Sequence, residues 1–461
     1  MTALVEGFDA DARGVARLLA GEGQTVRIAS PEPETAEVSA LRGLGISVEP
    51  YADLDADPGR AEVAYLDVWT PDTAPRVQRL RARGTRISCL GDLLLERWQG
   101  PTIGITGTAG KTTTTSLVAS MLRADGRSIA LSAGARAGNL WPTADLLDLL
   151  PGTDASRQQV LLVELTSSHL AFMCHSPKVG AVVSFWPDHL ELHGDLPRYQ
   201  AAKATIVLHQ GVNDVLVVNA DDASVRFAAD APGRVVEFSL RHAPREGAYL
   251  DHGSNVVLVE PSGAQVDLGP LTEGVTHRGN VVAAAAIARA SGVSSGAIAA
   301  AVGSIASLPY RARPVASLRG VPVVDDGMAA TPMKSAALLA RYPDRSVVLI
   351  AGGIDDAGGG AVHATAEESA LLDRACDEIA RAARSVVLFG AGGARLGPLL
   401  ARREVDALIV DDIAAAVSTA AGCATGAAAI VFSPLFPLSL EERAGFEALV
   451  ARSERLLSEN G

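Results

Sequence analysis

Gly104-Ile-Thr-Gly-Thr-Ala-Gly-Lys-Thr112 is the most informative segment of this chain, because it places a glycine-rich loop between an apolar strand and a helix. We expect the strand over residues 102–106 and the helix over 111–124. The backbone amides of such a loop and the helix N-terminus together form a nest for phosphate oxygens. Lys111 would contact the β- and γ-phosphates of a nucleotide, and Thr112 would bind magnesium. The spacing is TGTxGK[ST] instead of GxxxxGK[ST], and an ordinary strand-to-helix turn is the alternative interpretation.

Short β-branched strands alternate with helical stretches on both sides of this loop, a pattern that predicts parallel sheets covered by helices. At about 150 residues per domain, a chain of 461 residues suggests three domains. Glycine and proline interrupt the pattern at Gly100-Pro101 and at Leu308-Pro-Tyr-Arg-Ala-Arg-Pro314. We therefore expect an α/β protein with a Rossmann-like N-terminal domain over residues 1–99, a central P-loop ATPase-like domain with a parallel or mixed sheet over 100–312, and a Rossmann-like C-terminal domain over 313–461.

Composition and charge argue against several classes of protein. Apolar residues make up 48% of the chain and charged residues 20%, which is typical of packed globular domains. The formal net charge of -13 disfavours nucleic acid and anionic membranes as the main partner.

The four cysteines form no CxxC pair, so neither a disulfide framework nor a zinc site is indicated, and a reducing cytoplasm fits. No signal peptide is recognised. The uncharged run 413–440 is interrupted by glycine and proline, so we expect a helix, a turn and a buried strand there.

Three further side chains are candidates for chemistry. Glu164 lies at the C-terminal end of an expected buried strand, where a doubly wound sheet places a magnesium ligand, although a pairing with a basic residue is the alternative. His189 follows another strand and could offer a neutral imidazole nitrogen to a metal or lie beside an incoming amine, or it could be structural. Lys203 is the third candidate, and the alternative interpretation is an unmodified lysine on a surface helix.

These segments together resemble the Mur ligase family. The phosphate loop has the TGTxGK[ST] form of that family, and Trp186-Pro-Asp-His-Leu-Glu-Leu-His-Gly194 is similar to its PDHLDxHG segment. Lys203 matches a lysine that several members carry as a carbamate, which would turn a cation into a metal ligand. The resemblance implies ATP and two magnesium ions as cofactors. It implies catalytic roles for Lys111, Glu164, His189 and Lys203, and magnesium ligation by Thr112, Glu164, His189 and Lys203.

The resemblance also implies which residues contact the nucleotide and the substrate. Asn139, in Ala137-Gly138-Asn139, is similar to the GGNxG stretch near the donor. Asn280 resembles the second Asn of HNxxN, with His277 where the first would stand, and Arg311 resembles the PHR arginine. The implied nucleotide-binding residues are Gly107, Thr108, Gly110, Lys111, Thr112, Thr113, Asn280, Arg311 and Asp326, and the implied substrate-binding residues are Asn139, Thr166 and Ser167.

The implied reaction forms an amide from a carboxylic acid and an amine. The donor carboxylate attacks the γ-phosphorus of ATP, which gives an acyl phosphate and ADP. The amine then displaces phosphate through a tetrahedral intermediate, and no protein nucleophile is needed. Closure of the C-terminal domain over the central one would keep water away from the acyl phosphate.

Within the family, the length and the order of motifs are most similar to ligases that add D-glutamate to UDP-N-acetylmuramoyl-L-alanine, but the donor end differs. Those enzymes begin with a strand and a GxGxSG turn for the uridine diphosphate end of the substrate. This chain has Gly7, Asp9, Asp11 and Ala12 there, and the later SPG turn reads Thr70-Pro71-Asp72. Carboxylates at these positions would repel a diphosphate.

The acceptor end differs as well. The lysine and threonine of the DSKATN segment are replaced by Met328 and Ala330, and the lysine of GGxDKG is replaced by Asp356. The SPACASFDQF stretch is shortened around Ser433. A glutamate side chain buried without a cationic partner is strongly disfavoured. The sequence therefore predicts an altered acceptor pocket.

We therefore expect an ATP-dependent carboxylate-amine ligase whose donor, acceptor or both differ from those of cell-wall synthesis. A divergent D-glutamate-adding ligase and a non-catalytic nucleotide-binding sensor are the two alternatives. The expected partners are a small carboxylic acid and an amine or amino acid, with no nucleic acid and no membrane. We expect a cytoplasmic monomer.

Overall fold

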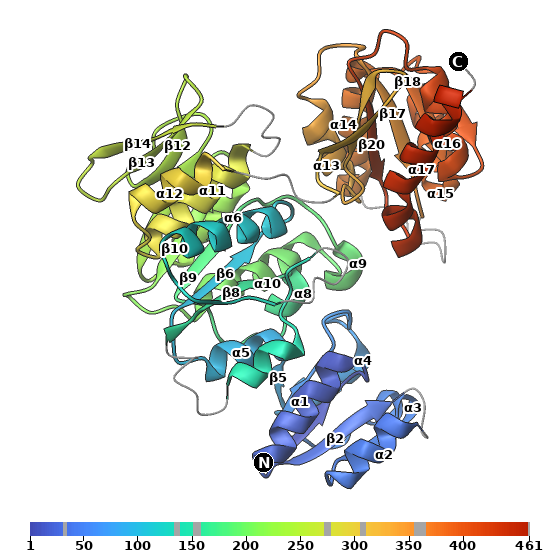
Figure 1. Cartoon of the computed structure of the whole chain (residues 1–461). Helices are drawn as coiled ribbons and strands as arrows, with labels where there is room; N and C mark the ends of the chain where they lie inside the picture. Colours follow the sequence, from blue (N-terminus) through green and yellow to red (C-terminus); the bar gives the residue numbers. More distant parts are fainter. Residues whose placement is uncertain are drawn as a thin grey trace. The chain divides into compact units, whose positions relative to one another are not determined.

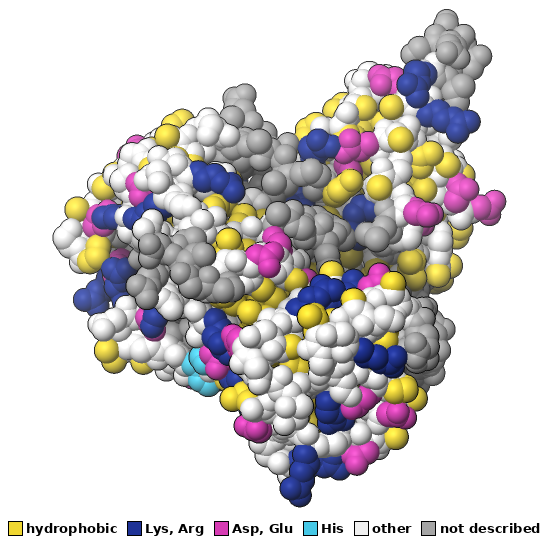
Figure 2. Space-filling view, turned by 60° about the horizontal axis from the view of Figure 1, so that its bottom comes forward, with side chains coloured by type: hydrophobic (Ala, Val, Ile, Leu, Met, Phe, Trp, Pro, Cys, Tyr) yellow, Lys and Arg dark blue, Asp and Glu magenta, His cyan; other side chains and the backbone are white. Residues whose placement is uncertain are grey.

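A computed structural model describes residues 1–30, 35–132, 139–150, 158–271, 278–304, 310–354 and 366–459. The chain divides into two compact units, Met1–Ile305 and Ala306–Gly461. The first unit contains a five-stranded and a nine-stranded sheet, and the second unit contains a six-stranded sheet (Figure 1). Helices pack against each sheet, so the expected α/β class is confirmed. Acidic and basic side chains are interspersed on the face shown in Figure 2.

The N-terminal sheet is parallel throughout and has the order β3-β2-β1-β4-β5. Its strands are β1 Thr2–Val5, β2 Thr25–Ser30, β3 Ser47–Pro50, β4 Val63–Tyr65 and β5 Arg86–Ser88, and its helices are α1 Ala10–Gly21, α2 Ala36–Gly43, α3 Tyr51–Ala56, α4 Pro75–Ala82 and α5 Leu90–Arg97. The side chains of Asp9 and Thr35 cap α1 and α2 by accepting backbone N–H groups in the first turn. Strand β4 ends at Tyr65, and the chain then makes a turn in which the Thr70 N–H donates to the Asp67 carbonyl.

The central sheet has the order β14-β13-β12-β11-β10-β9-β6-β8-β7. Its strands are β6 Thr102–Thr106, β7 Ile129–Ala130, β8 Val160–Glu164, β9 Val179–Val182, β10 Val215–Asn219, β11 Arg234–Ser239, β12 Gly247–Leu250, β13 Asn255–Val259 and β14 Gln265–Pro270. All neighbours are parallel except β12 with β13 and β13 with β14, so the sheet is mixed. Strand β6 lies between β8 and β9, and every residue of it is buried.

Helices cover both faces of the central sheet. They are α6 Lys111–Ala124, α8 Ser167–Leu170, α9 Leu190–His193, α10 Leu196–Leu208, α11 Arg278–Ala290 and α12 Ser295–Val302, with 3₁₀ turns η1 Ala144–Leu149 and η2 Ala223–Asp230. Helices α6, α11 and α12 share one hydrophobic cluster with the sheet. The many alanines of α11 allow it to pack closely against α6 and the strands. Helix α10 belongs to the cluster on the other face.

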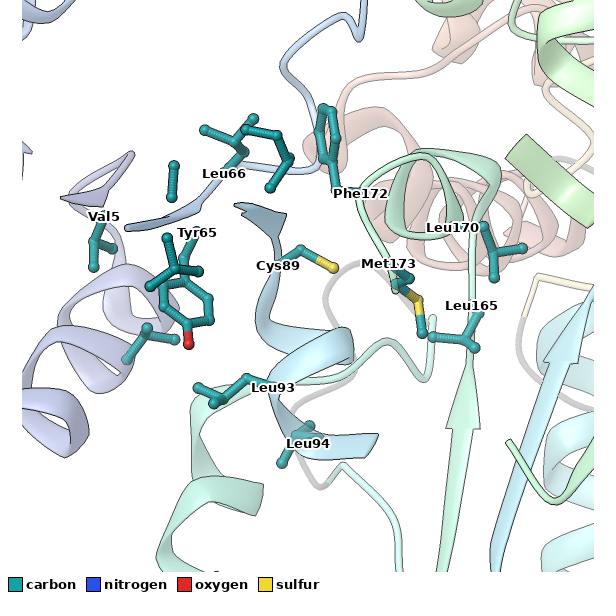
Figure 3. Packing of buried hydrophobic residues seen from close by; sticks show 14 of the residues in the cluster. Val5, Tyr65, Leu66, Cys89, Leu93, Leu94, Leu165, Leu170, Phe172 and Met173 are labelled. Atoms are coloured by element: carbon teal, nitrogen blue, oxygen red, sulfur yellow. The ribbon is translucent and has the colours of Figure 1, made fainter. Parts of the chain in front are cut away.

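One hydrophobic cluster runs from the N-terminal sheet into the central sheet, which explains why these two sheets form a single compact unit. Figure 3 shows Cys89, Leu93 and Leu94, from α5 and the residue before it, between Tyr65 on one side and Leu165 on the other. All five side chains are buried. Burial of such side chains contributes roughly 1.5–3 kcal/mol each.

The sheet of the second unit has the order β15-β16-β20-β17-β18-β19, with only β15 antiparallel to its neighbour. Its elements are β15 Arg313–Leu318, β16 Val321–Asp325, α13 Pro332–Leu339, β17 Val347–Gly352, α14 Ala366–Ala382, β18 Ala383–Phe389, α15 Gly390–Ala401, β19 Ala407–Val410, α16 Ile413–Gly422, β20 Ala429–Leu435 and α17 Leu440–Glu459. The uncharged run 413–440 forms helix α16, a turn and the buried strand β20, as expected. None of the helices in the described ranges has the length and apolar character needed to cross a bilayer.

Candidate active site

The glycine-rich loop connects β6, at the middle of the central sheet, to α6. Gly110 precedes the helix with φ +83°, a conformation that side-chain-bearing residues rarely adopt. A Cβ atom at Gly110 would lie 2.4 Å from Oδ1 of Asn280, so glycine lets this asparagine approach the loop closely. The Lys111 ammonium donates to the Gly107 carbonyl at 2.9 Å, and this hydrogen bond holds its charge beside the loop.

Neighbouring elements hold the loop in place. The Thr108 N–H donates to the Ser184 carbonyl at 3.0 Å, and the Thr108 hydroxyl lies 2.8 Å from the hydroxyl of Tyr199 on α10. The Ala109 N–H donates to the Ser184 hydroxyl at 2.9 Å. Thr113 is buried in the first turn of α6. The loop is therefore preorganised by groups from α10 and from the segment that follows β9.

Thr112, Glu164 and Asn139 come together beside the loop. The Thr112 hydroxyl donates to Glu164 Oε2 at 2.7 Å and lies 3.3 Å from Asn139 Oδ1. The same carboxylate oxygen accepts the Leu140 N–H at 3.0 Å, and Glu164 is only 1% exposed. Carboxylate, hydroxyl and amide oxygens are the ligands that magnesium prefers, so these side chains fit a magnesium ion.

Lys203 lies on α10 inside the same unit and is 1% exposed. Its Nζ atom is 3.4 Å from the Thr106 hydroxyl and 4.9 Å from the centre of the Tyr199 ring. Burial, and then the charge of Lys111, lower the pKa of Lys203 well below its ordinary value, while Asp188 acts in the opposite direction. The surface-lysine alternative does not agree with this burial.

His189 precedes α9 in a left-handed conformation, with φ 54° and ψ 35°. Its side chain is 47% exposed, and its Nε2 atom lies 3.7 Å from Asp188 Oδ2. Among the residues that the structure describes, no three His, Cys, Asp or Glu side chains are grouped so that they could hold a metal ion.

Thr166 and Ser167 follow β8. The Thr166 hydroxyl accepts the His169 N–H at 3.2 Å in a reciprocal cap of α8, and the Ser167 hydroxyl is 3.0 Å from His193 Nε2. Burial and the nearby charge of Lys111 lower the pKa of His169 to about 3, so this imidazole is neutral. His169 was not predicted as a site residue, although a histidine three residues after a Thr cap is visible in the sequence.

In the second unit, Asp326 is a buried acid at the end of β16. Its carboxylate accepts the Ala312 N–H and the Ser433 hydroxyl, both at 3.0 Å. Burial raises the pKa of Asp326 to about 7. Arg311 is half-buried, and its neighbours Tyr310 and Ala312 both have positive φ, at 60° and 48°. Ala137, Gly138, His277 and Asp356 lie outside the described residues.

Two adjacent cavities lie above the carboxyl ends of the N-terminal strands, with volumes of about 70 Å³ and 470 Å³. Asp9 and Asp67 line both of them, and Asp11 lines the smaller one. Asp72 does not line either cavity. Asp67 and the aromatic residues Trp69 and Trp141 of the smaller cavity were missed by sequence reasoning, because the turn after β4 and the segment before η1 meet there only after the chain has folded.

A glycine-rich loop between a central parallel strand and a helix, with a buried acid on the neighbouring strand of the sheet, is typical of P-loop nucleotide-binding α/β proteins. Residues 105–288 match the model of the Mur ligase middle domain. The chain is 34% identical over 446 residues to the UDP-N-acetylmuramoylalanine--D-glutamate ligase of Frankia casuarinae, covering 94% of this chain and 88% of that protein. The corresponding ligase of Geobacillus kaustophilus is 29% identical, with 94% and 92% covered.

Solved structures agree in fold. MurF ligase from Thermotoga maritima in complex with ADP superposes with a TM-score of 0.59 at 17% identity, covering 95% of this chain and 96% of that one. The chain belongs to the Mur ligase family. Members of this family are ATP-dependent ligases that form amide bonds, so the protein is an enzyme of that kind.

We expect Gly110→Ala to abolish tight nucleotide binding, because the new methyl group would collide with Asn280. Gly126→Ala is the matched control, since Gly126 has a similar φ of +74° but no atom within 4 Å of the position that its new methyl group would take. Calorimetric titration with ADP and magnesium should show at least about a tenfold loss of affinity for Gly110→Ala only. Equal affinities in the two variants would contradict the close approach of Asn280.

Asp326 should make the stability of the enzyme depend on pH. Its folded pKa of about 7 lies above the ordinary value near 4, so its favourable contribution is complete below pH 4 and is lost as the pH rises to 7. The change is at most about 4 kcal/mol, from roughly 1.4 kcal/mol per pKa unit. The difference in free energy of unfolding between wild type and Asp326→Asn, measured by urea unfolding, should change between pH 5 and pH 8. A difference that stays constant would contradict the raised pKa of Asp326.

Proposed function

We propose that this enzyme joins a carboxylic acid to an amine with a donor, an acceptor or both that differ from those of the D-glutamate-adding ligases. The observation that carries the proposal is the cap of α1. Asp9 accepts the Ala12 N–H at 2.9 Å, so the chain's own carboxylate takes a helix N-terminus that could otherwise bind phosphate. A diphosphate placed there would meet Asp9 and Asp67 as like charges.

The second carboxylate on α1, Asp11, is also held in place by a hydrogen bond within the chain. Its carboxylate accepts the Ala144 N–H at 2.8 Å and thereby ties α1 to η1. Asp9 and Asp11 therefore have structural partners and are integrated into the fold. These carboxylates lie at the carboxyl ends of the N-terminal strands. Their negative charge makes this part of the domain poorly suited to the uridine diphosphate end of a cell-wall precursor.

The proposed centre uses the residues beside the loop. Lys111 and the loop amides from Gly107 to Gly110 hold the triphosphate of ATP, and Asn280 contacts the nucleotide. A magnesium ion would be held by Thr112 and Glu164 and would neutralise phosphate charge. A second magnesium site would use Glu164, His189 and carbamylated Lys203. Asn139, Thr166 and Ser167 would orient the donor carboxylate.

The burial of Lys203 supports its carbamylation. A lowered pKa increases the share of the neutral amine, and the neutral amine is the form that adds to carbon dioxide. The product is an anionic carbamate beside Lys111, whose charge disfavours an ammonium but favours an anion. Conversion of Lys203 to a carbamate thus replaces an unfavourable like-charge contact with a favourable one.

The proposed reaction depends on charged and polar groups held close to the phosphates, and it uses no protein nucleophile. Lys111 and the loop N–H groups stabilise the phosphate oxygens while the donor carboxylate attacks the γ-phosphorus, with ADP as the leaving group. The amine nitrogen then attacks the acyl carbon, and the C–O bond to phosphate breaks as the amide forms. The buried side chains around the loop limit the access of water to the acyl phosphate.

The acceptor side of the second unit supports an altered amine. Met328 and Ala330 supply neither a cation nor a hydroxyl at two positions where the D-glutamate-adding ligases carry lysine and threonine. We place the acceptor in residues 313–461, the nucleotide in 100–312 and the donor tail in 1–99, in a cytoplasmic monomer. The names and identities of the relatives favour one second candidate, a divergent D-glutamate-adding ligase.

Phosphate release separates these candidates. The protein with ATP and magnesium should release phosphate with other acid and amine pairs, and should release little with UDP-N-acetylmuramoyl-L-alanine and D-glutamate. Rapid turnover of that pair would identify a divergent D-glutamate-adding ligase instead. Tight ATP binding without phosphate release for any pair would indicate a nucleotide sensor.

Lys203→Ala should lower turnover by at least about 100-fold, because the proposed anionic ligand is lost. Added formate or acetate should partly restore phosphate release by supplying a carboxylate in the space of the missing side chain. Lys178→Ala is the control, since Lys178 is 68% exposed and lies away from the loop. Full activity of Lys203→Ala, or no response to short carboxylates, would remove the carbamate from the mechanism.

A further inference from the structure

Two backbone N–H groups of the glycine-rich loop are already bound within the protein. The Thr108 N–H donates to the Ser184 carbonyl at 3.0 Å, and the Ala109 N–H donates to the Ser184 hydroxyl at 2.9 Å. The Ser184 hydroxyl in turn donates to the Ala109 carbonyl at 2.9 Å, so one side chain binds both polar backbone groups of Ala109. A phosphate oxygen that uses the Ala109 N–H therefore competes with Ser184.

The N–H groups at the start of α6 differ from that of Ala109. Helix geometry leaves the N–H groups of Lys111, Thr112 and Thr113 without an acceptor inside the helix. The first N–H with such an acceptor is that of Thr114, which donates to the Gly110 carbonyl at 2.9 Å. An anion can bind to the helix start directly. It can bind to Ala109 only after the hydrogen bond to Ser184 has broken.

Ser184 itself is held firmly in place. Its residue is only 8% exposed. On one side, the Val183 N–H donates to the Thr106 carbonyl at 2.9 Å, and on the other side the Phe185 N–H donates to the Asp222 carboxylate at 3.2 Å. The backbone of Ser184 is thus fixed by both neighbours. Its hydroxyl can leave Ala109 only by rotation of the side chain or by movement of the loop.

The ammonium group of Lys111 lies close to this contact. It donates to the carbonyl of Gly107, two residues before Ala109, at 2.9 Å. Gly107 packs tightly on the same segment, because a Cβ atom there would lie 2.7 Å from Cγ2 of Val183. A phosphate bound by Lys111 therefore approaches the loop near Ala109. Charge-assisted hydrogen bonds are roughly twice as strong as neutral ones, so the phosphate displaces the hydroxyl.

We infer that Ser184 restrains the phosphate loop against nucleotide binding. Its hydroxyl keeps the Ala109 N–H occupied until the phosphates of a nucleotide take this N–H over, and breaking the two hydrogen bonds lowers the apparent affinity. Ser184 acts through Ala109 and is a positioning residue for the reaction. The inference rests on the proposed function, since it takes the nucleotide phosphates to lie on this loop.

Calorimetric titration of the full-length protein with magnesium and adenylyl imidodiphosphate, a non-hydrolysable ATP analogue, tests the sign of this contribution. Ser184→Ala removes the competing hydroxyl, so we expect binding that is about three- to tenfold tighter, the equivalent of one neutral hydrogen bond. Ser184→Thr keeps a hydroxyl and should bind like wild type. Weaker or unchanged binding in Ser184→Ala would overturn the inference, because Ser184 would then support the loop or have no influence on it.

Ser176→Ala is the matched control. The Ser176 hydroxyl also accepts a backbone N–H, that of His209 at 3.0 Å, and donates to a backbone carbonyl, that of Thr205 at 2.6 Å. Ser176 precedes β9 whereas Ser184 follows it, so the two serines lie at opposite ends of one strand. The affinity of Ser176→Ala should stay within about twofold of wild type. An equal gain in both variants would show a general effect of losing a hydroxyl and would overturn the specific role of Ser184.

Hydrogen exchange at the loop provides a second readout. By mass spectrometry of loop peptides, the Ala109 N–H should exchange slowly in wild type and at least about tenfold faster in Ser184→Ala. The analogue with magnesium should restore slow exchange in the variant, because a phosphate oxygen then accepts this N–H. Rapid exchange at Ala109 in wild type would contradict the hydrogen bond on which the inference depends.

Failure of this inference is distinguishable from failure of the proposed function. Lys111→Ala should abolish tight binding of the analogue, because the loop then lacks its ammonium group. Unchanged binding by Lys111→Ala would overturn the placement of the phosphates and this inference together. Loss of binding in Lys111→Ala, combined with no gain in Ser184→Ala, would overturn the role of Ser184 alone.

Discussion

A hydrogen bond between a buried carboxylate and a helix hydroxyl organises the centre of this protein. Glu164 ends β8, Thr112 belongs to the first turn of α6, and the 2.7 Å contact between them joins two elements that are far apart in the sequence. A buried carboxylate is tolerated only with such partners, and Leu140 supplies a second one. The positions of the loop, of Asn139 and of the segment leading to the N-terminal cavities all depend on this contact.

The charges around this contact limit what the centre can bind. Lys111 and Lys203 both lie near the loop, and Lys203 is almost fully buried, so two ammonium groups would repel each other there. Burial and the charge of Lys111 lower the pKa of Lys203, so the ammonium form is disfavoured there. Phosphate oxygens, a carboxylate or a metal-bound oxygen can then share the positive field of Lys111, which is the combination that acyl phosphate formation requires. The same contacts that stabilise the loop therefore also suit its chemistry.

The regular elements near the loop were predicted closely from the sequence, because periodicity and glycine placement are local signals. Residues 102–106 and 111–124 form the expected strand and helix. The antiparallel strands β12, β13 and β14 were not anticipated, since their pairing depends on contacts along the sheet edge. Long-range contacts such as Ser167 with His193 cannot be inferred from a local pattern either, because the two residues meet only after the chain has folded.

The N-terminal carboxylates show why motif comparison needs a structure. In the sequence, Asp9, Asp11 and Asp72 are all acids added to phosphate-binding turns. In the fold, Asp9 caps α1, Asp11 bonds to Ala144, and Asp72 lies outside both cavities, while Asp67 lines both. A carboxylate that caps a helix stabilises the fold and also repels nearby anions, because its hydrogen bond does not neutralise its negative charge. Asp9 therefore stabilises the first helix and also contributes a negative charge to both cavities.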